Sequence, residues 1–309
     1  MTTTSYQQAS SSSWFRQPPQ DLGGIRRIEL PVSSQRGSVN IYLVPQQDGW
    51  ILVDCGMNLP NVLPAYEAAG IDWSTIRQIV LTHTHPDHAG FAERIRQLTG
   101  APVRMHRREN ELLKKLRAAE QWLSWQDEVL QWARVPHSAR GCIRDAFQEM
   151  QPFFPTLAAD SYIEHGEIIP TALGPMKALL TPGHSQGHLC FYVAEKKLLL
   201  AGDQLLRPRT PHLEWYAEGN ALADFRASLR QLQILSVDWV LPSHGRAFAE
   251  SEGRIASLLD CSRDMGNRIA SLRARGNESA HQLALAYWKR PMTPFEHRNA
   301  VFEMLAYIQ

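Results

Sequence analysis

Short apolar runs alternate with longer amphipathic stretches along most of the chain. The runs are rich in Ile, Leu and Val and are bounded by Gly, Pro or Asp, which is typical of β-strands. The longer stretches space their apolar residues as helices do. The pattern predicts strands at 26–33, 38–44, 50–54, 77–82, 102–106, 161–169, 176–181, 188–194, 197–202 and 238–242, and helices at 60–69, 89–98 and 221–235.

This order of elements predicts a fold of the α/β class with two mixed sheets. The strands before residue 107 would form one sheet, and those from residue 161 onward a second sheet. Two sheets that bury one face on each other, with helices over the outer faces, form an αββα sandwich. We therefore expect an αββα sandwich over residues 23–250.

Three segments depart from this strand pattern. Residues 107–157 read as a helical insertion that carries three tryptophans. Residues 251–309 read as a C-terminal extension of three helices. Residues 1–22 are polar and rich in serine, so we expect this N-terminal segment to be loose.

One predicted strand leads into a cluster of ligand-type side chains. His83 and His85 follow the strand two positions apart, so their imidazoles point the same way. Pro86 then permits a tight turn, and Asp87 and His88 open the next helix. Three histidines and a carboxylate are costly to bury without partners. The cluster therefore indicates a metal site.

Three further apolar runs each end beside a ligand-type side chain. His184 follows the run at 176–181, Asp203 follows 197–202, and His244 follows 238–242. Loop residues at strand ends are where α/β proteins place their chemistry. One such residue is weak evidence, but four strand ends of this kind in one chain indicate a complete site.

Taken in order, these residues resemble the ligand motifs of the metallo-β-lactamase superfamily. Within that superfamily the chain is similar to the lactamase-like and glyoxalase-II-like hydrolases. The His-x-His-x-Asp-His run and the Thr-Pro-Gly-His run carry the resemblance, which covers roughly residues 26 to 250. The helical tail resembles the winged-helix-like ends of some relatives. The resemblance implies His83, His85 and His184 as ligands of a first metal, Asp87, His88 and His244 as ligands of a second, and Asp203 as the bridge.

The implied cofactor is a pair of Zn²⁺ ions per chain, although imidazoles and carboxylates also suit iron or manganese. Two metals roughly 3.5–4 Å apart hold a hydroxide beside the electrophile's oxygen. The expected reaction is attack of a metal-bound hydroxide on the carbonyl of a small ester, thioester or lactone. We expect Asp87 to orient the nucleophile as well as to bind metal. We expect Asp54 to accept a hydrogen bond from a ligand histidine.

Residues close to the metal motifs are the candidates for a substrate pocket. Arg207, Arg209 and His212 follow the bridging carboxylate and would meet an anionic group of the substrate. Tyr216 offers a hydroxyl, and Trp125 of the insertion offers an apolar wall. Because the insertion lies between two segments that carry candidate metal ligands, we expect it to cap the site. The alternative is that the insertion forms a contact between subunits of an oligomer.

Composition narrows the class of partner. A net charge of +1 gives no general basic field for nucleic acid, and no apolar run is long enough to predict a membrane span. The first residues contain no apolar stretch of a signal peptide, and the four cysteines form no Cys-x-x-Cys pair. We therefore expect a cytoplasmic protein that acts on a small molecule, and a homodimer is left open.

Two other functions are open at this point. One is a metal-dependent endoribonuclease or phosphodiesterase, which a basic stripe and salt-sensitive RNA binding would distinguish. The other is a mononuclear iron dioxygenase acting on persulfides, because those relatives share many of the same residues. Metal content would decide the second case.

Overall fold

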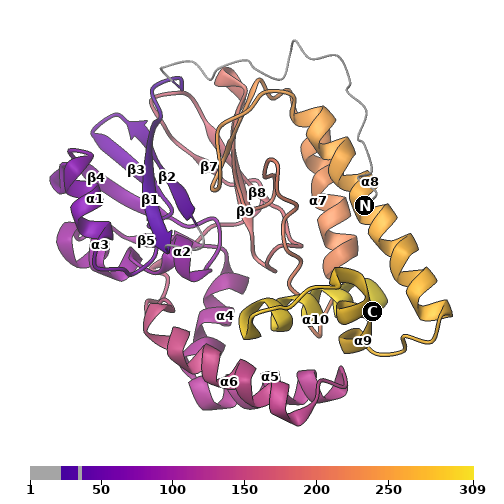
Figure 1. The fold of residues 1–309 in the computed structure, drawn as a ribbon. Helices are drawn as coiled ribbons and strands as arrows, with labels where there is room; N and C mark the ends of the chain where they lie inside the picture. Colours follow the sequence, from indigo (N-terminus) through magenta and orange to yellow (C-terminus); the bar gives the residue numbers. More distant parts are fainter. Residues whose placement is uncertain (1–21, 34–36) are drawn as a thin grey trace.

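The computed structural model describes residues 22–33 and 37–309, and the strands of this part form two mixed sheets (Figure 1). The first sheet contains, in spatial order, β1 (Arg26–Ser33), β2 (Gly37–Gln46), β3 (Gly49–Val53), β4 (Ile76–Val80), β5 (Val103–Met105) and β6 (Ser161–Tyr162). The second contains β11 (Trp239–Pro242), β10 (Leu198–Gly202), β9 (Leu189–Val193), β8 (Met176–Leu180) and β7 (Ile168–Ile169).

An apolar core fills the space between the two sheets. Val44, Val53 and Val80 of the first sheet are buried in the same cluster as Phe191 and Leu241 of the second. Every residue of β9 is buried, because the other sheet covers one face and helices cover the opposite face. This arrangement brings the ends of strands from both sheets to shared edges.

Helices cover both outer faces. On the first sheet, α1 (Val62–Ala68) and α3 (Ala92–Thr99) bury Tyr66 and Ile95 in one cluster with strand residues. On the second sheet, α7 (Ala221–Gln233) and α8 (Ser251–Ala274) bury Phe225 and Ile255 in another. The predicted αββα sandwich is therefore confirmed.

The insertion consists of α4 (Arg107–Arg117), α5 (Ala119–Trp132) and α6 (His137–Met150). The tail continues from α8 into α9 (Ala280–Trp288) and α10 (Pro294–Ile308), and α10 packs on α6. Figure 1 shows α4, α5, α6, α9 and α10 gathered at one end of the molecule. Buried residues of α5, α6, α9 and α10 belong to the cluster on the outer face of the second sheet, so the insertion, the tail and that sheet share one core.

The start of α10 is fixed by a capping box. The Thr293 hydroxyl accepts a hydrogen bond from the Glu296 backbone N–H, and the Glu296 carboxylate accepts one from the Thr293 N–H. Pro294 occupies the first turn, where its missing N–H costs nothing. No strand lies between residues 251 and 309, so the likeness to a winged helix does not extend to the wing.

Two predicted elements differ from the observed ones. The strand predicted at 161–169 in the second sheet is wrong, because β6 pairs with β5 of the first sheet and only β7 pairs with β8 of the second. Gly166, with a φ of 84°, lies in the crossing between them. The helix predicted at 89–98 is divided into α2 (Pro86–Ala89) and α3.

The loose segment predicted at 1–22 lies outside the described residues, apart from Leu22. Within the described part of the chain, no helix combines the length and the apolar content needed to cross a membrane.

Candidate metal centre

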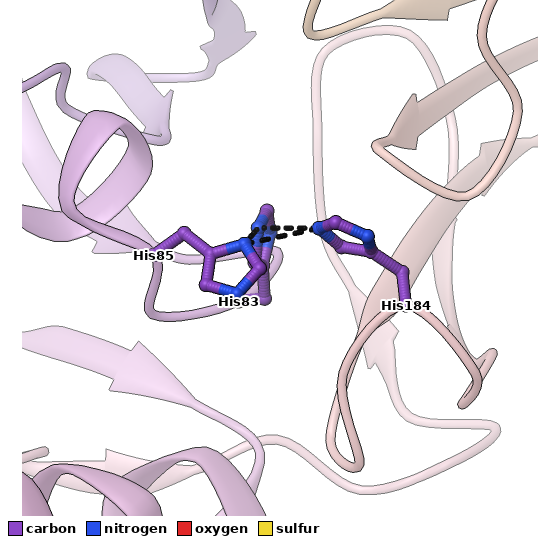
Figure 2. Close-up of side chains that lie close together, drawn as sticks. All are labelled: His83, His85 and His184. Carbon is purple, nitrogen blue, oxygen red and sulfur yellow. Dashed lines mark hydrogen bonds between the residues drawn. The ribbon is translucent and has the colours of Figure 1, made fainter. Parts of the chain in front are cut away.

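Two loops at one edge of the sandwich bring three imidazoles together. His83 and His85 lie on the extended segment after β4, and His184 lies in the loop after β8 (Figure 2). Nδ1 of His85 is 2.9 Å from Nε2 of His83 and 3.0 Å from Nε2 of His184. The two Nε2 atoms are 3.2 Å apart. Nitrogens at about 2.05 Å from a tetrahedral ion would be roughly 3.3 Å apart, so the three atoms fit one metal.

A second set of ligand atoms adjoins the first. Nε2 of His244 is 3.4 Å from Oδ2 of Asp87, and Nε2 of His88 is 4.0 Å from Oδ1 of Asp87. Both Nε2 atoms are 3.6 Å from Oδ1 of Asp203. The other carboxylate oxygen of Asp203 is 3.5 Å from Nε2 of His184. The Asp203 carboxylate therefore lies between the two sets.

Two buried atoms of this site lack a hydrogen-bond partner among the described residues. They are Nε2 of His88 and Oδ1 of Asp203. A buried polar atom without a partner costs about 1–3 kcal/mol. Because both atoms belong to the ligand sets, bound cations would satisfy them. The residues present therefore fit metal ions.

The outer ring nitrogens of the histidines are held by groups away from the site. Nδ1 of His184 donates to the backbone carbonyl of His212 at 2.8 Å, and Nδ1 of His244 donates to that of Ser38 at 2.8 Å. A carbonyl only accepts, so these rings carry their proton on Nδ1 and present the lone pair of Nε2 to the site. The backbone thus selects the tautomer that metal binding would require.

Asp54 contacts the second set on the side away from its ligand atoms. Its Oδ2 is 2.9 Å from Nδ1 of His88 and accepts a hydrogen bond from the Thr82 hydroxyl at 2.8 Å, while Oδ1 accepts one from the Thr82 backbone N–H at 2.8 Å. The residue follows β3 with a left-handed φ of 60°. Its carboxylate is therefore buried behind His88, and its observed contacts are those of a positioning group.

Burial keeps the imidazoles of the first set neutral. Loss of solvation lowers the pKa of His85 to about 4 and that of His184 to about 3. Burial, reinforced by neighbouring histidines, holds the pKa of His83 well below its usual range. Neutral imidazoles have a free lone pair at physiological pH, which is what metal binding requires.

The second set carries more negative charge than the first, because carboxylates surround His88. Burial lowers the pKa of His88, but the carboxylates of Asp203, Asp54 and Asp87 outweigh burial and raise the pKa to about 10. In the metal-free chain a proton on His88 thus offsets part of this negative charge. A divalent cation would replace that proton, so metal binding here should release protons.

His188 fixes the backbone next to the bridging carboxylate. Its Nε2 accepts a hydrogen bond of 3.1 Å from the Asp203 backbone N–H, so Nδ1 carries the proton and donates to the Thr181 hydroxyl at 2.9 Å. Gly202 lies against the ring, and a Cβ there would be 2.5 Å from Nε2 of His188. The residue is a hydrogen-bonded group at the start of β9, not a ligand.

Glu109 is a buried residue of the site that motif reasoning missed. On the first turn of α4, it accepts hydrogen bonds from the Thr84 N–H at 2.9 Å and hydroxyl at 2.7 Å. Its other oxygen accepts from the Ser185 hydroxyl at 2.7 Å and the Gly187 N–H at 2.8 Å. One carboxylate thus ties together both loops of the first set. A carboxylate on the buried face of α4, four residues before Leu113, was the available signal.

A cavity of about 510 Å³ adjoins both ligand sets. His85, Asp87, His184 and Asp203 line it, together with residues of the insertion, the loop after β10 and α10. Of the predicted pocket residues, three line this cavity: Trp125, His212 and Tyr216.

Arg207 and Arg209 do not line the cavity, although the sequence placed them at the substrate pocket. Their segment instead lies against α8, where the guanidinium of Arg254 donates to the carbonyls of Leu206, Pro208 and Arg209. Closeness to Asp203 in the sequence was therefore a poor guide, because the chain turns away directly after β10. The cationic side chains at the cavity come from other elements.

One of these cations is Arg298 of α10, which sequence reasoning also missed. Its two terminal nitrogens donate to both carboxylate oxygens of Glu214, at 2.7 and 2.5 Å. Glu214 is 3.4 Å from Nε2 of His212, and Glu303 is 3.4 Å from Nδ1 of the same ring. Since the backbone carbonyl of His212 holds His184, the C-terminal helix is linked to the first metal set.

Comparison with known proteins identifies the family. The family model described as the metallo-beta-lactamase superfamily matches residues 35–244. The chain is 28% identical to the probable metallo-hydrolase YqjP of Bacillus subtilis over 89% of this chain and 84% of that protein. It is also 28% identical to the acyl-coenzyme A thioesterase MBLAC2 of Gallus gallus, over 80% of this chain and 87% of that protein.

A solved structure shows the same architecture. The metallo-beta-lactamase family protein TTHA1429 from Thermus thermophilus superposes with a TM-score of 0.79 and 25% sequence identity. The match covers 92% of this chain and 91% of that one, so it extends to the insertion and the tail. The chain therefore belongs to the metallo-β-lactamase superfamily and is a hydrolase of that superfamily.

Proposed function

We propose that this hydrolase is dinuclear and cleaves carboxylic thioester or ester bonds. The observation that carries the proposal is the pair of ligand sets that share Asp203 on the wall of one cavity. A single complete set would fit one metal ion, whereas both sets are complete in this chain. Zn²⁺ is the proposed ion because the ligands are imidazoles and carboxylates in compact groups.

Bound metal ions would supply Lewis acidity and a hydroxide nucleophile at neutral pH. Asp87 lines the cavity as well as the second set, so its carboxylate is placed to orient water by accepting a hydrogen bond. Burial raises the pKa of Asp87, but His88 and His244 outweigh it and hold the pKa well below its usual range. Asp87 therefore stays ionised and acts as an acceptor throughout the physiological range.

In the proposed reaction the oxygen of water bonds to the acyl carbon, and the carbon–sulfur or carbon–oxygen bond breaks. The leaving thiolate or alkoxide takes up a proton, so the products are a carboxylic acid and a thiol or alcohol. The relative named as an acyl-coenzyme A thioesterase supports the thioester form of the substrate. The apolar walls of the cavity also favour an acyl compound over a phosphodiester, whose charges they would desolvate.

The test is a substrate panel with the metal-loaded protein. We expect hydrolysis of thioesters or esters, and no turnover of an RNA phosphodiester or a cephalosporin. Asp203→Asn keeps the size of the bridging side chain but removes its charge, so it should abolish turnover, while the exposed Asp238→Asn should not. Preferential cleavage of the phosphodiester, or oxygen consumption on a persulfide, would overturn the proposal.

A further inference from the structure

The cavity has an aromatic wall built by three helices. Trp122 of α5, Phe147 of α6 and Phe295 of α10 all line it, as does Phe154. The ring centroids of Trp122 and Phe147 are 5.3 Å apart, those of Phe147 and Phe295 are 5.1 Å apart, and those of Trp122 and Phe154 are 6.1 Å apart. These rings therefore form one continuous apolar surface.

A series of contacts between polar residues leads from the first metal set to the aromatic wall. His184 contacts His212, and His212 contacts Glu214. Glu214 binds Arg298, whose guanidinium carbon lies 5.6 Å from the centre of the Phe147 ring. Polar side chains thus connect the first metal set to the aromatic wall.

Other lining residues are exposed and polar. Lys115 and Gln121 of the insertion and Glu218 of the loop after β10 line the same cavity and are accessible to solvent. The Gln186 side chain, next but one after His184, donates to the Glu218 carbonyl at 3.4 Å. The cavity therefore has a polar side that a hydrophilic part of a ligand can occupy without being desolvated.

The size of the cavity sets a scale for its occupant. At the roughly 30 Å³ that one water molecule occupies in the liquid, 510 Å³ is room for on the order of 17 non-hydrogen atoms. An acetyl group would leave most of this apolar space to water. A chain of roughly eight carbons would occupy about half of this room and leave the rest to the thiol or alcohol.

We infer that the cavity binds an apolar acyl chain of roughly eight carbons or more, with the scissile carbonyl beside the metal ligands and the polar thiol or alcohol on the exposed side. This inference rests on the proposed function and assigns its substrate class. Hydrolysis would then release a medium- or long-chain carboxylic acid and a thiol or alcohol. The insertion and α10 select the substrate, because they supply the aromatic wall.

The first experiment measures kcat/KM of the metal-loaded protein for acetyl, octanoyl and dodecanoyl thioesters of N-acetylcysteamine. Burial of one methylene is worth about 0.8 kcal/mol, which is about fourfold in kcat/KM. We expect octanoyl to exceed acetyl by roughly 100-fold or more, even if only part of that burial is realised. Equal kcat/KM values along the series would overturn the inference.

A variant with its control tests the location. Ala118 lines the cavity where α4 meets α5, so Ala118→Trp should fill part of it and lower the dodecanoyl-to-acetyl ratio of kcat/KM at least about tenfold. Its neighbour Ala119 does not line the cavity, so Ala119→Trp should keep the wild-type ratio. If the dodecanoyl-to-acetyl ratio is unchanged in Ala118→Trp, or is lowered equally in both variants, the acyl chain binds elsewhere and the inference is wrong.

Binding of the product acid separates this inference from the proposed reaction. Dodecanoate should bind the metal-loaded protein and change the tryptophan fluorescence, since three lining residues are tryptophans, and Ala118→Trp should weaken this binding. If no thioester or ester of any length is hydrolysed, the proposed function fails, and dodecanoate binding still decides the inference. Failure of dodecanoate to bind more tightly than acetate would contradict it.

Discussion

At the scale of single residues, the geometry of the candidate site depends on groups that do not face its ligand atoms. Backbone carbonyls hold Nδ1 of His184 and His244, and Asp54 holds Nδ1 of His88. Each contact fixes both the tautomer and the direction of a ring, so the Nε2 atoms are aimed before any ion arrives. The candidate ligands could be predicted from the sequence, whereas these orienting contacts depend on the three-dimensional fold.

Replacing Asp54 separates orientation from ligation. Asp54→Ala removes the acceptor for His88 and for both donors of Thr82, so we expect roughly 10–100-fold weaker metal binding at the second set, with a smaller effect at the first. Asp203→Ala removes a carboxylate that lies between the sets and should weaken both. Metal competition against a chromophoric chelator measures this, and an equal loss in the two variants would make the positioning role of Asp54 wrong.

His212 gives the metal-free protein a dependence of stability on pH. Burial lowers its pKa, but Glu214 and Glu303 outweigh burial and raise the pKa to about 9. Because the pKa in the folded state exceeds the unfolded value of about 6.5, the stabilisation is full below pH 6.5 and is lost as the pH rises through 9.

Glu303→Gln should therefore destabilise the metal-free protein by about 1–2 kcal/mol at pH 6, where His212 is charged. The difference in free energy of unfolding from wild type should shrink towards pH 9.5, where the imidazole is neutral. Urea unfolding at pH 6, 8 and 9.5 measures this difference. A difference that stays constant over the range would mean that Glu303 acts through packing alone.

At the scale of elements, the insertion is joined to the metal loops by a single carboxylate. Glu109 of α4 accepts two hydrogen bonds from the loop of His83 and His85 and two from the loop of His184. The two loops come from different sheets, so this contact spans the edge of the sandwich. The position of α4 and the spacing of the first set are therefore linked.

Glu109→Gln tests that link. The amide nitrogen of glutamine cannot accept a hydrogen bond, so the donors on one side of the carboxamide lose their acceptor at a position buried from solvent. We expect roughly 10–100-fold weaker metal binding at the first set and an altered absorption spectrum of the Co²⁺-substituted protein. Glu111→Gln is the control, because Glu111 is exposed and pairs with Lys114 of the same helix. Equal metal affinity in the two variants would leave Glu109 as a structural contact only.

Elements with strong local patterns could be predicted from the sequence, and elements defined by distant partners could not. The strands before the ligands and the His-x-His-x-Asp-His run are local signals, so the ligand clusters appeared where the motifs lie. The run at 161–169 carried no information on which sheet each half would join. Arg298 reaches Glu214 across 84 positions of sequence, and no periodicity links the two.

At the scale of the whole molecule, loops from the two sheets supply the candidate ligands, and the added helices supply much of the cavity lining. The sandwich places strand ends from both sheets at one edge, which gives the ligand sets. The insertion and α10 lie at one end of the molecule (Figure 1), and residues of both line the cavity that candidate ligands also line. Fold and family thus account for the candidate ligand sets, while under our proposal the helices outside the sandwich determine which substrates fit.

The most direct test of the dinuclear proposal is a titration of metal-free protein with Zn²⁺ that follows binding and thioester hydrolysis together. Two ligand sets with a shared Asp203 predict that both signals saturate near two equivalents per chain, with protons released as His88 is metallated. Binding that saturates at one equivalent with full activity, or activity that requires a single iron and oxygen, would contradict the dinuclear hydrolase.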